Sequence, residues 1–340
     1  MVSRNEALKL SGALDEFKSF DVTPIIGTEF VDASLKDWLE SPNSEQLLRD
    51  LAITVSRRGV AFFRKQDGMT DEMQKTIVQR LGVLTGKPAT SSLHRHAVKI
   101  QGQEDDEILL VNSEENKKII GGTIYDPSFQ LRQSCRPLWH CDISYEPIPS
   151  DYCLLRLNEV PESGGDTLWA SGYELYDRLS RPLQSFFETL SATHQELRQR
   201  DASDPRFQTP RGSPENVGAN RNPVHPLIRT NPVTGWKSVY GVGLHIKAIN
   251  DVTPGESDWL LEKLSRLLVE NHDLQVRFRR NDRNDVAIWD NRCTYHAATY
   301  DHDGYGIREG RRVCGVGEKP FLDPASPSRR AALAAEGQGA

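Results

Sequence analysis

The chain has 340 residues, 37% of them hydrophobic and 26% charged, which is enough to bury a large core in one domain or two small ones. Its net charge of −6 and its lack of a long apolar run give no reason to expect nucleic acid or a membrane as a partner. Five cysteines without a Cys-x-x-Cys pair, and a polar start without the apolar core of a secretory signal, predict a reducing compartment, with the cytoplasm as the expected location.

The predicted elements of the first half follow a polar segment, 1–19, that we expect to be flexible. Ser44 is the expected N-cap of the first long helix, and Gly59 is its expected end. In chain order we predict a strand at 20–27, helices at 41–58 and 70–84, and buried strands at 60–64, 108–111 and 152–157.

The second half of the chain contains more strands than helices. We predict a helical stretch at 171–190 interrupted by Pro182, a hairpin at 227–240, a helix at 256–271, short strands at 275–278, 286–289 and 312–316, and a tail at 323–340 that is either a short helix or irregular. Many short strands separated by turns and flanked by helices predict a mainly β (α+β) fold with a double-stranded β-helix, or jelly-roll, core. No linker divides it, so we expect one domain over 20–322.

Two long polar segments, 113–136 and 198–223, interrupt this pattern. Long loops in compact domains are often lids or binding loops. We therefore interpret both segments as lid insertions beside a binding site. A variable surface insertion is the alternative for the first of them, which immediately precedes His140.

His140 and Asp142 are the first candidates for a metal site because they lie two residues apart. On a strand, both side chains would project from one face, with Cys141 facing away. One further imidazole would complete the set of two histidines and one carboxylate that holds iron in non-haem Fe(II) oxygenases and leaves coordination positions open. His-x-Asp alone occurs by chance in many chains, so the prediction depends on the sequence downstream.

Three arginines, Arg308, Arg311 and Arg312, follow a second notable stretch that ends at His296. Arginine is suited to bidentate capture of a carboxylate. An iron with open positions can chelate a 2-oxo acid, and the far carboxylate of 2-oxoglutarate would then need a cation from Arg308 or Arg312. Arg311 is the competing candidate, but alternation in the last strand would put Arg312 and Cys314 on one face and Arg311 on the other.

Several longer motifs point to a known family. They are RGVAFFR at 58–64, WHCD at 139–142, GGDTLW at 164–169, HPLIRTNPVTG at 225–235, WDNRCTYH at 289–296 and GEKP at 317–320. With these motifs the chain resembles the taurine/2,4-dichlorophenoxyacetate dioxygenase family over residues 20 to 320, and its fungal branch more than its bacterial one. The resemblance implies an Fe(II) enzyme that uses 2-oxoglutarate and O2 as cosubstrates, forms succinate and CO2, and hydroxylates a small organic molecule.

The same resemblance implies roles for single residues. His140, Asp142 and His296 match the family's iron ligands. Thr167 and Arg308 match the threonine and the arginine that contact 2-oxoglutarate. The candidate substrate residues are His96, Arg136, His245 and Arg312, and Arg312 lies where the family places a second arginine between cosubstrate and anionic substrate.

Departures from the bacterial sulfonate enzymes leave the substrate open. Arg136 stands where those enzymes carry asparagine, His245 stands where they carry a pocket aromatic, and the spacing from His296 to Arg308 is one residue longer. We expect a substrate with a sulfonate, carboxylate or similar group, because Arg312, His96 and His245 would give the site a cationic character. A neutral secondary metabolite is the alternative.

Two readings from other classes compete with an oxygenase. A non-catalytic jelly-roll protein would bind the metal without turnover, and a zinc hydrolase would use the same three ligands with water. The zinc reading leaves Thr167 and the arginines unexplained. The sequence predicts a small-molecule substrate and leaves homo-oligomerisation open.

Overall fold

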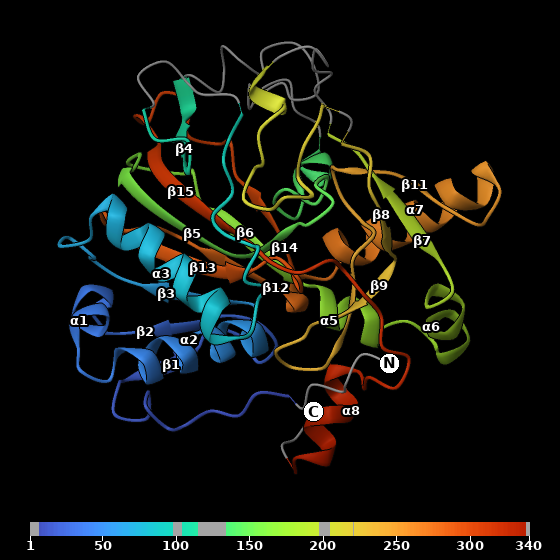
Figure 1. Cartoon of the computed structure of the whole chain (residues 1–340), viewed down its shortest axis with the longest axis horizontal. Coiled ribbons are helices and arrows are strands. Elements are labelled where there is room, and N and C mark those ends of the chain that lie inside the picture. Colours follow the sequence, from blue (N-terminus) through green and yellow to red (C-terminus); the bar gives the residue numbers. More distant parts are fainter. Residues whose placement is uncertain (1–6, 98–103, 115–133, 197–204, 220, 338–340) are drawn as a thin grey trace.

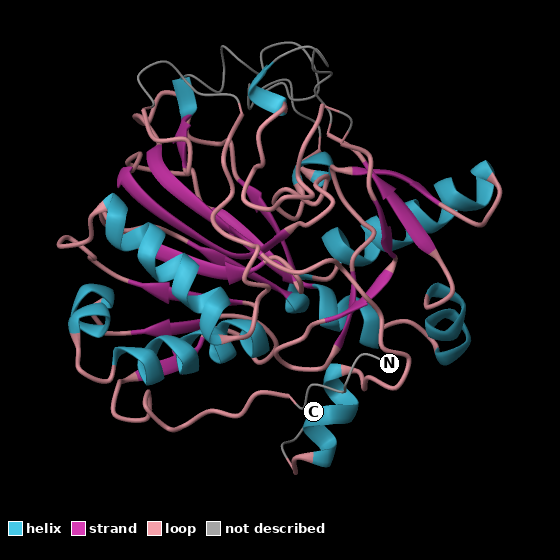
Figure 2. Cartoon of the chain, in the orientation of Figure 1, coloured by secondary structure: helices cyan, strands magenta, loops and turns pink. Residues whose placement is uncertain are grey.

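The computed structural model describes residues 7–97, 104–114, 134–196, 205–219 and 221–337. Strands occupy the middle of the molecule and helices lie at its periphery (Figures 1 and 2). A seven-stranded sheet has the order β1 (Ser19–Asp21), β2 (Thr28–Phe30), β3 (Val60–Phe63), β13 (Val286–Asp290), β5 (Ser150–Glu159), β15 (Glu309–Val316) and β4 (Ile108–Asn112). A smaller sheet has the order β12 (Gln275–Phe278), β6 (Thr167–Ser171) and β14 (Thr294–Ala298).

The remaining strands form two minor sheets, and seven α-helices are described. The strands are β11 (Ile246–Ile249), β7 (Ser191–His194) and β8 (Val224–Pro226) in one sheet, and β9 (Ile228–Thr230) and β10 (Lys237–Val239) in the other. The helices are α1 (Leu35–Glu40), α2 (Ser44–Arg58), α3 (Asp71–Leu84), α5 (Gly172–Asp177), α6 (Arg181–Phe187), α7 (Pro254–Glu270) and α8 (Arg329–Ala335). Short 3-10 helices lie at Arg136–Leu138, Pro205–Phe207 and His272–Leu274.

The seven-stranded sheet and the β12-β6-β14 sheet pack face to face around one apolar cluster. Trp169 of β6 lies 5.5 Å from Phe62 of β3 and 5.7 Å from Trp289 of β13, measured between ring centroids. Strand alternation separates the two faces, because Phe62 belongs to this inner cluster and Phe63 to the cluster under the helices. The predicted mainly β, jelly-roll fold is confirmed.

Helices cover the outer faces of both sheets. Residues of α2 and α3 share a buried cluster with β3, β5, β13 and β15, and residues of α5 and α7 share another with β6 and β14. The N-cap of α2 is Asn43 and not Ser44, which is the first residue of the helix and accepts a hydrogen bond from Arg80 through its hydroxyl (2.8 Å). Gly59 ends α2 as predicted, with φ of +79° and no room for a side chain beside Thr294.

Both terminal regions are attached to this core where the structure describes them. The buried Asp50 carboxylate accepts hydrogen bonds from the backbone N–H groups of Ser11, Gly12 and Ala13 at 2.9 to 3.1 Å. The polar sequence of this segment does not predict these contacts. The flexibility expected for residues 1–19 stays a prediction. Of the two forms expected for the tail, the short helix is the one present, as α8.

The first predicted lid lies largely outside the described residues and the second only partly outside them, and the role of both as lids stays a prediction. Part of the second is described, and there Arg211 donates two hydrogen bonds to the fully buried Glu146 carboxylate, at 2.7 and 2.8 Å. Arg221 and His94 approach the same carboxylate at 3.4 and 3.5 Å. We call these four residues the Glu146 cluster; it binds the described part of this loop to the segment that follows Asp142.

Candidate active site

The backbones of His140 and His296 form an isolated antiparallel bridge. Each N–H donates to the other residue's carbonyl, at 3.0 and 2.9 Å, and the two imidazole centroids lie 4.2 Å apart. We expected a strand through His140 and Asp142, but the pairing stops at His140. The chain turns at Asp142, and Ile143 has a φ of +45°. The turn, rather than strand alternation, therefore brings the carboxylate beside the imidazoles.

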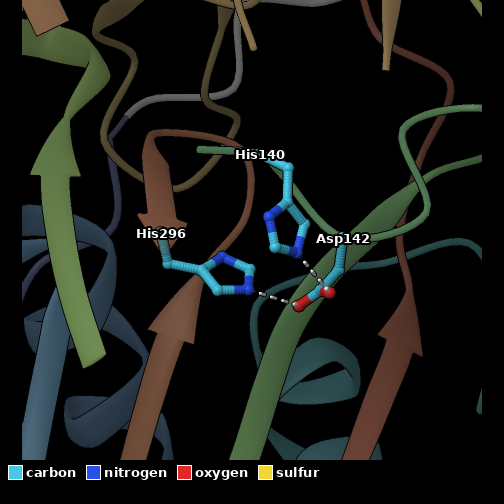
Figure 3. Close-up of side chains that lie close together, drawn as sticks. All are labelled: His140, Asp142 and His296. Carbon is cyan, nitrogen blue, oxygen red and sulfur yellow. Dashed lines mark ion pairs between the residues drawn. The ribbon is translucent and has the colours of Figure 1, made fainter. Parts of the chain in front are cut away.

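The three candidate metal ligands converge in Figure 3. His140 Nε2 lies 3.8 Å from one Asp142 carboxylate oxygen, and His296 Nε2 lies 3.6 Å from the other. The Nδ1–H of His140 donates to the Leu138 carbonyl (2.8 Å), which directs Nε2 toward the carboxylate. Asn291 accepts the backbone N–H of Asp142 (3.0 Å) and so fixes the turn.

The electrostatics of this group suit a cation. Burial opposes ionisation of Asp142, but the pKa of Asp142 is lowered, foremost by Arg312, whose Nη1 lies 2.6 Å from Oδ1. Burial also lowers the pKa of His140 and of His296, which keeps the imidazoles neutral with a lone pair available. The second oxygen of Asp142, Oδ2, is buried and accepts no hydrogen bond within the described chain. Two neutral imidazoles and one ionised carboxylate form a donor set that fits a divalent transition metal.

A second group of potential ligands adjoins the first. Cys153 and Cys314 face each other across β5 and β15, and their sulfurs lie within 4.8 Å of an Asp142 oxygen. Burial, followed by the neighbouring Cys314, raises the pKa of Cys153, so its thiol stays protonated. A protonated thiol is a poor metal ligand, and the described residues therefore favour the histidine set.

The other end of the site is built around the hydroxyl of Thr167. Arg308 donates from Nη2 to Thr167 Oγ1 (3.2 Å) and from Nε to the Gly165 carbonyl (2.7 Å). Arg280, which the sequence analysis did not single out, donates from Nη1 to the same hydroxyl at 3.0 Å. We call Thr167, Arg280 and Arg308 the Thr167 cluster; all three are buried.

Strand register relates this cluster to the metal ligands. On β14 and β6, His296 pairs with Trp169 and Ala298 pairs with Thr167. Paired residues, and residues two apart, project from the same face of a sheet, so His296 and Thr167 point to the same side. That side faces β15, which carries Arg312 and Cys314 inward while Arg311 pairs outward with Asp71 (2.9 Å). The predicted alternation is confirmed.

The structure brings two of the other candidate substrate residues to the metal ligands and leaves one away from them. His245 lies 5.8 Å from His140 between ring centroids, because Gly243 packs directly against the Trp139 carbonyl. Arg312 and Asp142 are among the charges that shift the pKa of His96, so His96 lies within electrostatic range of both. Arg136 is not brought to this group, and its assignment is corrected. Its guanidinium hydrogen-bonds the side chains of two α7 residues, Glu262 and Ser265.

Arg280 could have been found from the sequence with one further step. Val276 and Phe278 of β12 face the inner cluster, and continuing their alternation puts Arg280 on the same face. Tyr145 was also missed; its ring centroid lies 4.8 Å from that of His245. No pattern in the sequence predicts the isolated bridge or the turn after His140, so the position of Tyr145 beside His245 could not be predicted.

Comparison with known proteins decides the family. A sequence model of the taurine catabolism dioxygenase TauD, TfdA family matches residues 18–315. The chain belongs to this family. It is 69% identical over 333 residues to alpha-ketoglutarate-dependent dioxygenase btcD of Neocamarosporium betae, covering 96% of this chain and 98% of the relative. It is 50% identical over 337 residues to alpha-ketoglutarate-dependent dioxygenase oryG of Aspergillus oryzae, covering 98% of each.

The solved structures agree with this assignment. A taurine dioxygenase from Burkholderia xenovorans matches with a TM-score of 0.67 and 25% identity, over 91% of this chain and 94% of that one. This TauD/TfdA enzyme is thus a dioxygenase that depends on 2-oxoglutarate, another name for alpha-ketoglutarate, and on O2, and it acts on a small molecule. The predicted family and enzyme class are confirmed. Among the described helices none is both long and apolar enough to cross a membrane.

Proposed function

We propose that this TauD/TfdA enzyme holds Fe(II) with His140, Asp142 and His296 and uses it to hydroxylate a small organic substrate. The observation that carries the proposal is the convergence of two neutral imidazoles on an ionised carboxylate, with Oδ2 of Asp142 buried and accepting no hydrogen bond within the described chain. Bound iron would supply the redox centre for O2 and leave positions for the 2-oxo acid. The protein's residues hold the metal, orient the cosubstrate and exclude water.

We assign the cosubstrate to the space between the metal ligands and the Thr167 cluster. The 2-oxo acid end would lie toward His296 and the far carboxylate toward Arg308, since both residues border the same inner face. A guanidinium buried beside a hydroxyl gives a carboxylate two kinds of hydrogen-bond donor in a fixed geometry. Arg308, and not Arg311, is the proposed cosubstrate arginine.

The substrate is proposed to carry an anionic group that reaches Arg312, the partly exposed guanidinium beside Asp142. A neutral substrate is the second candidate, and a specific observation favours it. Arg312 already pairs with Asp142, and burial lowers the pKa of His245 to about 3 and that of His96 below its usual range, which leaves both imidazoles uncharged. Inhibition by inorganic sulfate and simple alkylsulfonates would support the anionic substrate; no inhibition at millimolar concentration would favour the neutral one.

The iron assignment has its own experiment. His140→Ala, Asp142→Ala and His296→Ala should each lose bound Fe(II), measured by metal analysis after dialysis, and should lose 2-oxoglutarate-dependent succinate formation. Circular dichroism should report an unchanged fold. A variant that keeps full turnover would remove its residue from the ligand set, and activity restored by Zn(II) instead of Fe(II) would favour a hydrolase. The cytoplasmic location stays a prediction from the sequence, and homo-oligomerisation stays open.

A further inference from the structure

We infer that Arg280 is a second arginine that binds the cosubstrate, and that the guanidiniums of Arg280 and Arg308 together bind the far carboxylate of 2-oxoglutarate. The enzyme would then bind 2-oxo acids with a second carboxylate far more tightly than those without one. The inference rests on the proposed function, because it assigns the cosubstrate to the Thr167 cluster. Its first support is the hydroxyl of Thr167, which accepts one hydrogen bond from each guanidinium.

Arg280 keeps unused donors in a buried position. Its side chain is 7% exposed, and Nε and Nη2 have no hydrogen-bond partner within the described chain. A buried guanidinium normally has all its N–H groups paired, since each unpaired donor loses its water without compensation. Nε and Nη2 are two adjacent nitrogens on one planar guanidinium, and a carboxylate accepts one hydrogen bond from each of two such nitrogens in a bidentate contact.

The nearby carboxylates are already engaged elsewhere. Asp166 pairs with Arg277 at 2.6 Å, and Asp285 pairs with Arg64 at 2.9 Å. In the part of the chain that the structure describes, neither Arg280 nor Arg308 forms an ion pair. Two buried positive charges therefore share one neutral hydroxyl.

Such an arrangement is unfavourable without a ligand. Burial, followed by repulsion from Arg308, lowers the pKa of Arg280 to about 9, and burial lowers the pKa of Arg308 as well. An anion bound between the two guanidiniums would remove that penalty and would satisfy the free N–H groups. A structural role for Arg280 is the competing explanation, because its guanidinium also lies 5.4 Å from the centroid of the Phe278 ring.

The test compares two acids that differ only at the far end. 2-Oxoglutarate has a carboxylate there and 2-oxobutyrate does not, while both chelate a metal in the same way. Binding of each acid to the Mn(II)-loaded full chain is measured by titration calorimetry, so the readout does not depend on turnover. We expect Arg280→Met to weaken 2-oxoglutarate binding by about 10- to 30-fold and to change 2-oxobutyrate binding by less than about twofold. Arg280→Lys should restore part of the loss.

The neighbouring Arg279, which is exposed, offers a matched control. Arg279→Met should bind both acids as the unmodified protein does. Equal weakening of both acids in Arg280→Met, or no weakening of 2-oxoglutarate, would overturn the inference. The proposed function would fail separately if the unmodified protein did not bind 2-oxoglutarate, or if Arg308→Met bound it normally. Weaker binding in Arg308→Met together with normal binding in Arg280→Met would overturn only the role of Arg280.

Discussion

The Glu146 cluster and the Thr167 cluster each contain two buried arginines, and they differ in the group at the centre. The Glu146 cluster surrounds a carboxylate, and the Thr167 cluster surrounds a hydroxyl. In the first, the negative charge is supplied by the chain, and the pKa of Glu146 is lowered to about 2 because its histidine and arginine partners outweigh burial. In the second, no carboxylate of the described chain is paired with the guanidiniums.

The difference indicates what each cluster does. A buried arginine whose counterion belongs to the chain holds two segments together, because removing either charge leaves the other unpaired. A buried arginine whose counterion is missing from the chain is stabilised only when a ligand brings one. The same residue type thus serves structure beside Glu146 and, in our proposal, cosubstrate binding beside Thr167.

The largest effect is expected when the Thr167 cluster receives a carboxylate from the chain, as the Glu146 cluster has. Thr167→Asp should neutralise one guanidinium and repel the far carboxylate, which would weaken 2-oxoglutarate binding at least about 1000-fold, on the order of 4 kcal/mol. The melting temperature without ligand should stay the same or rise. Thr167→Asn is the uncharged control of equal size and should lose much less affinity. Normal binding by the Asp variant would contradict the assignment of this cluster to the cosubstrate.

Removing the carboxylate from the Glu146 cluster should have the opposite kind of effect. Glu146→Gln leaves the buried Arg211 guanidinium without its carboxylate, while Arg221 keeps its ion pair with Glu196. The substitution should lower the free energy of unfolding by about 3 kcal/mol at neutral pH, with no change in 2-oxoglutarate affinity. Because the folded pKa of Glu146 lies below the unfolded one, its stabilisation is present above about pH 4.5 and is lost as pH falls toward 2. Urea denaturation across this range should show a smaller loss of stability in the variant. An unchanged pH dependence would show that Glu146 is not ionised in the folded protein.

Removing the charge of Arg308 alone tests how much one of the two guanidiniums contributes to cosubstrate binding. Arg308→Met deletes the hydrogen bonds to Thr167 and Gly165 together with the charge, and should raise the KM for 2-oxoglutarate by about 30- to 100-fold, roughly 2 to 3 kcal/mol. Steady-state succinate formation measures this. An unaltered KM would transfer the cosubstrate role to another cation.

The smallest effect is expected at Arg311, on the outer face of the same strand. Its ion pair with Asp71 is partly exposed, and such pairs contribute less than about 1 kcal/mol. Arg311→Met should therefore leave the KM for 2-oxoglutarate within about twofold. A large rise here together with a small one in Arg308→Met would reverse the register that we assign to β15.

The predictable part of the site follows from periodicity and motifs. Strand alternation was enough to turn Arg312 inward and Arg311 outward, and the predicted elements recur as β3, β5, β12 and β13. Arg136 was misplaced because its partner, Glu262, lies on a helix far along the sequence, and no local pattern couples the two. Arg280 was missed because an arginine just after a strand ordinarily faces solvent; the alternation of Val276 and Phe278 gives its face, and the packing of the two sheets buries it.

Because His140 and His296 are joined by a backbone bridge, the distance between their imidazoles does not depend on the length of the chain between them. Two backbone hydrogen bonds fix the distance between the imidazoles, and the long intervening segment passes through loops that do not contribute to that distance. Insertions, deletions and substitutions in those loops can therefore reshape what reaches the metal without moving its ligands. A fold of this kind can change substrates through loop variation while its chemistry stays constant, and loop-exchange chimeras between relatives should retain metal binding even where substrate choice changes.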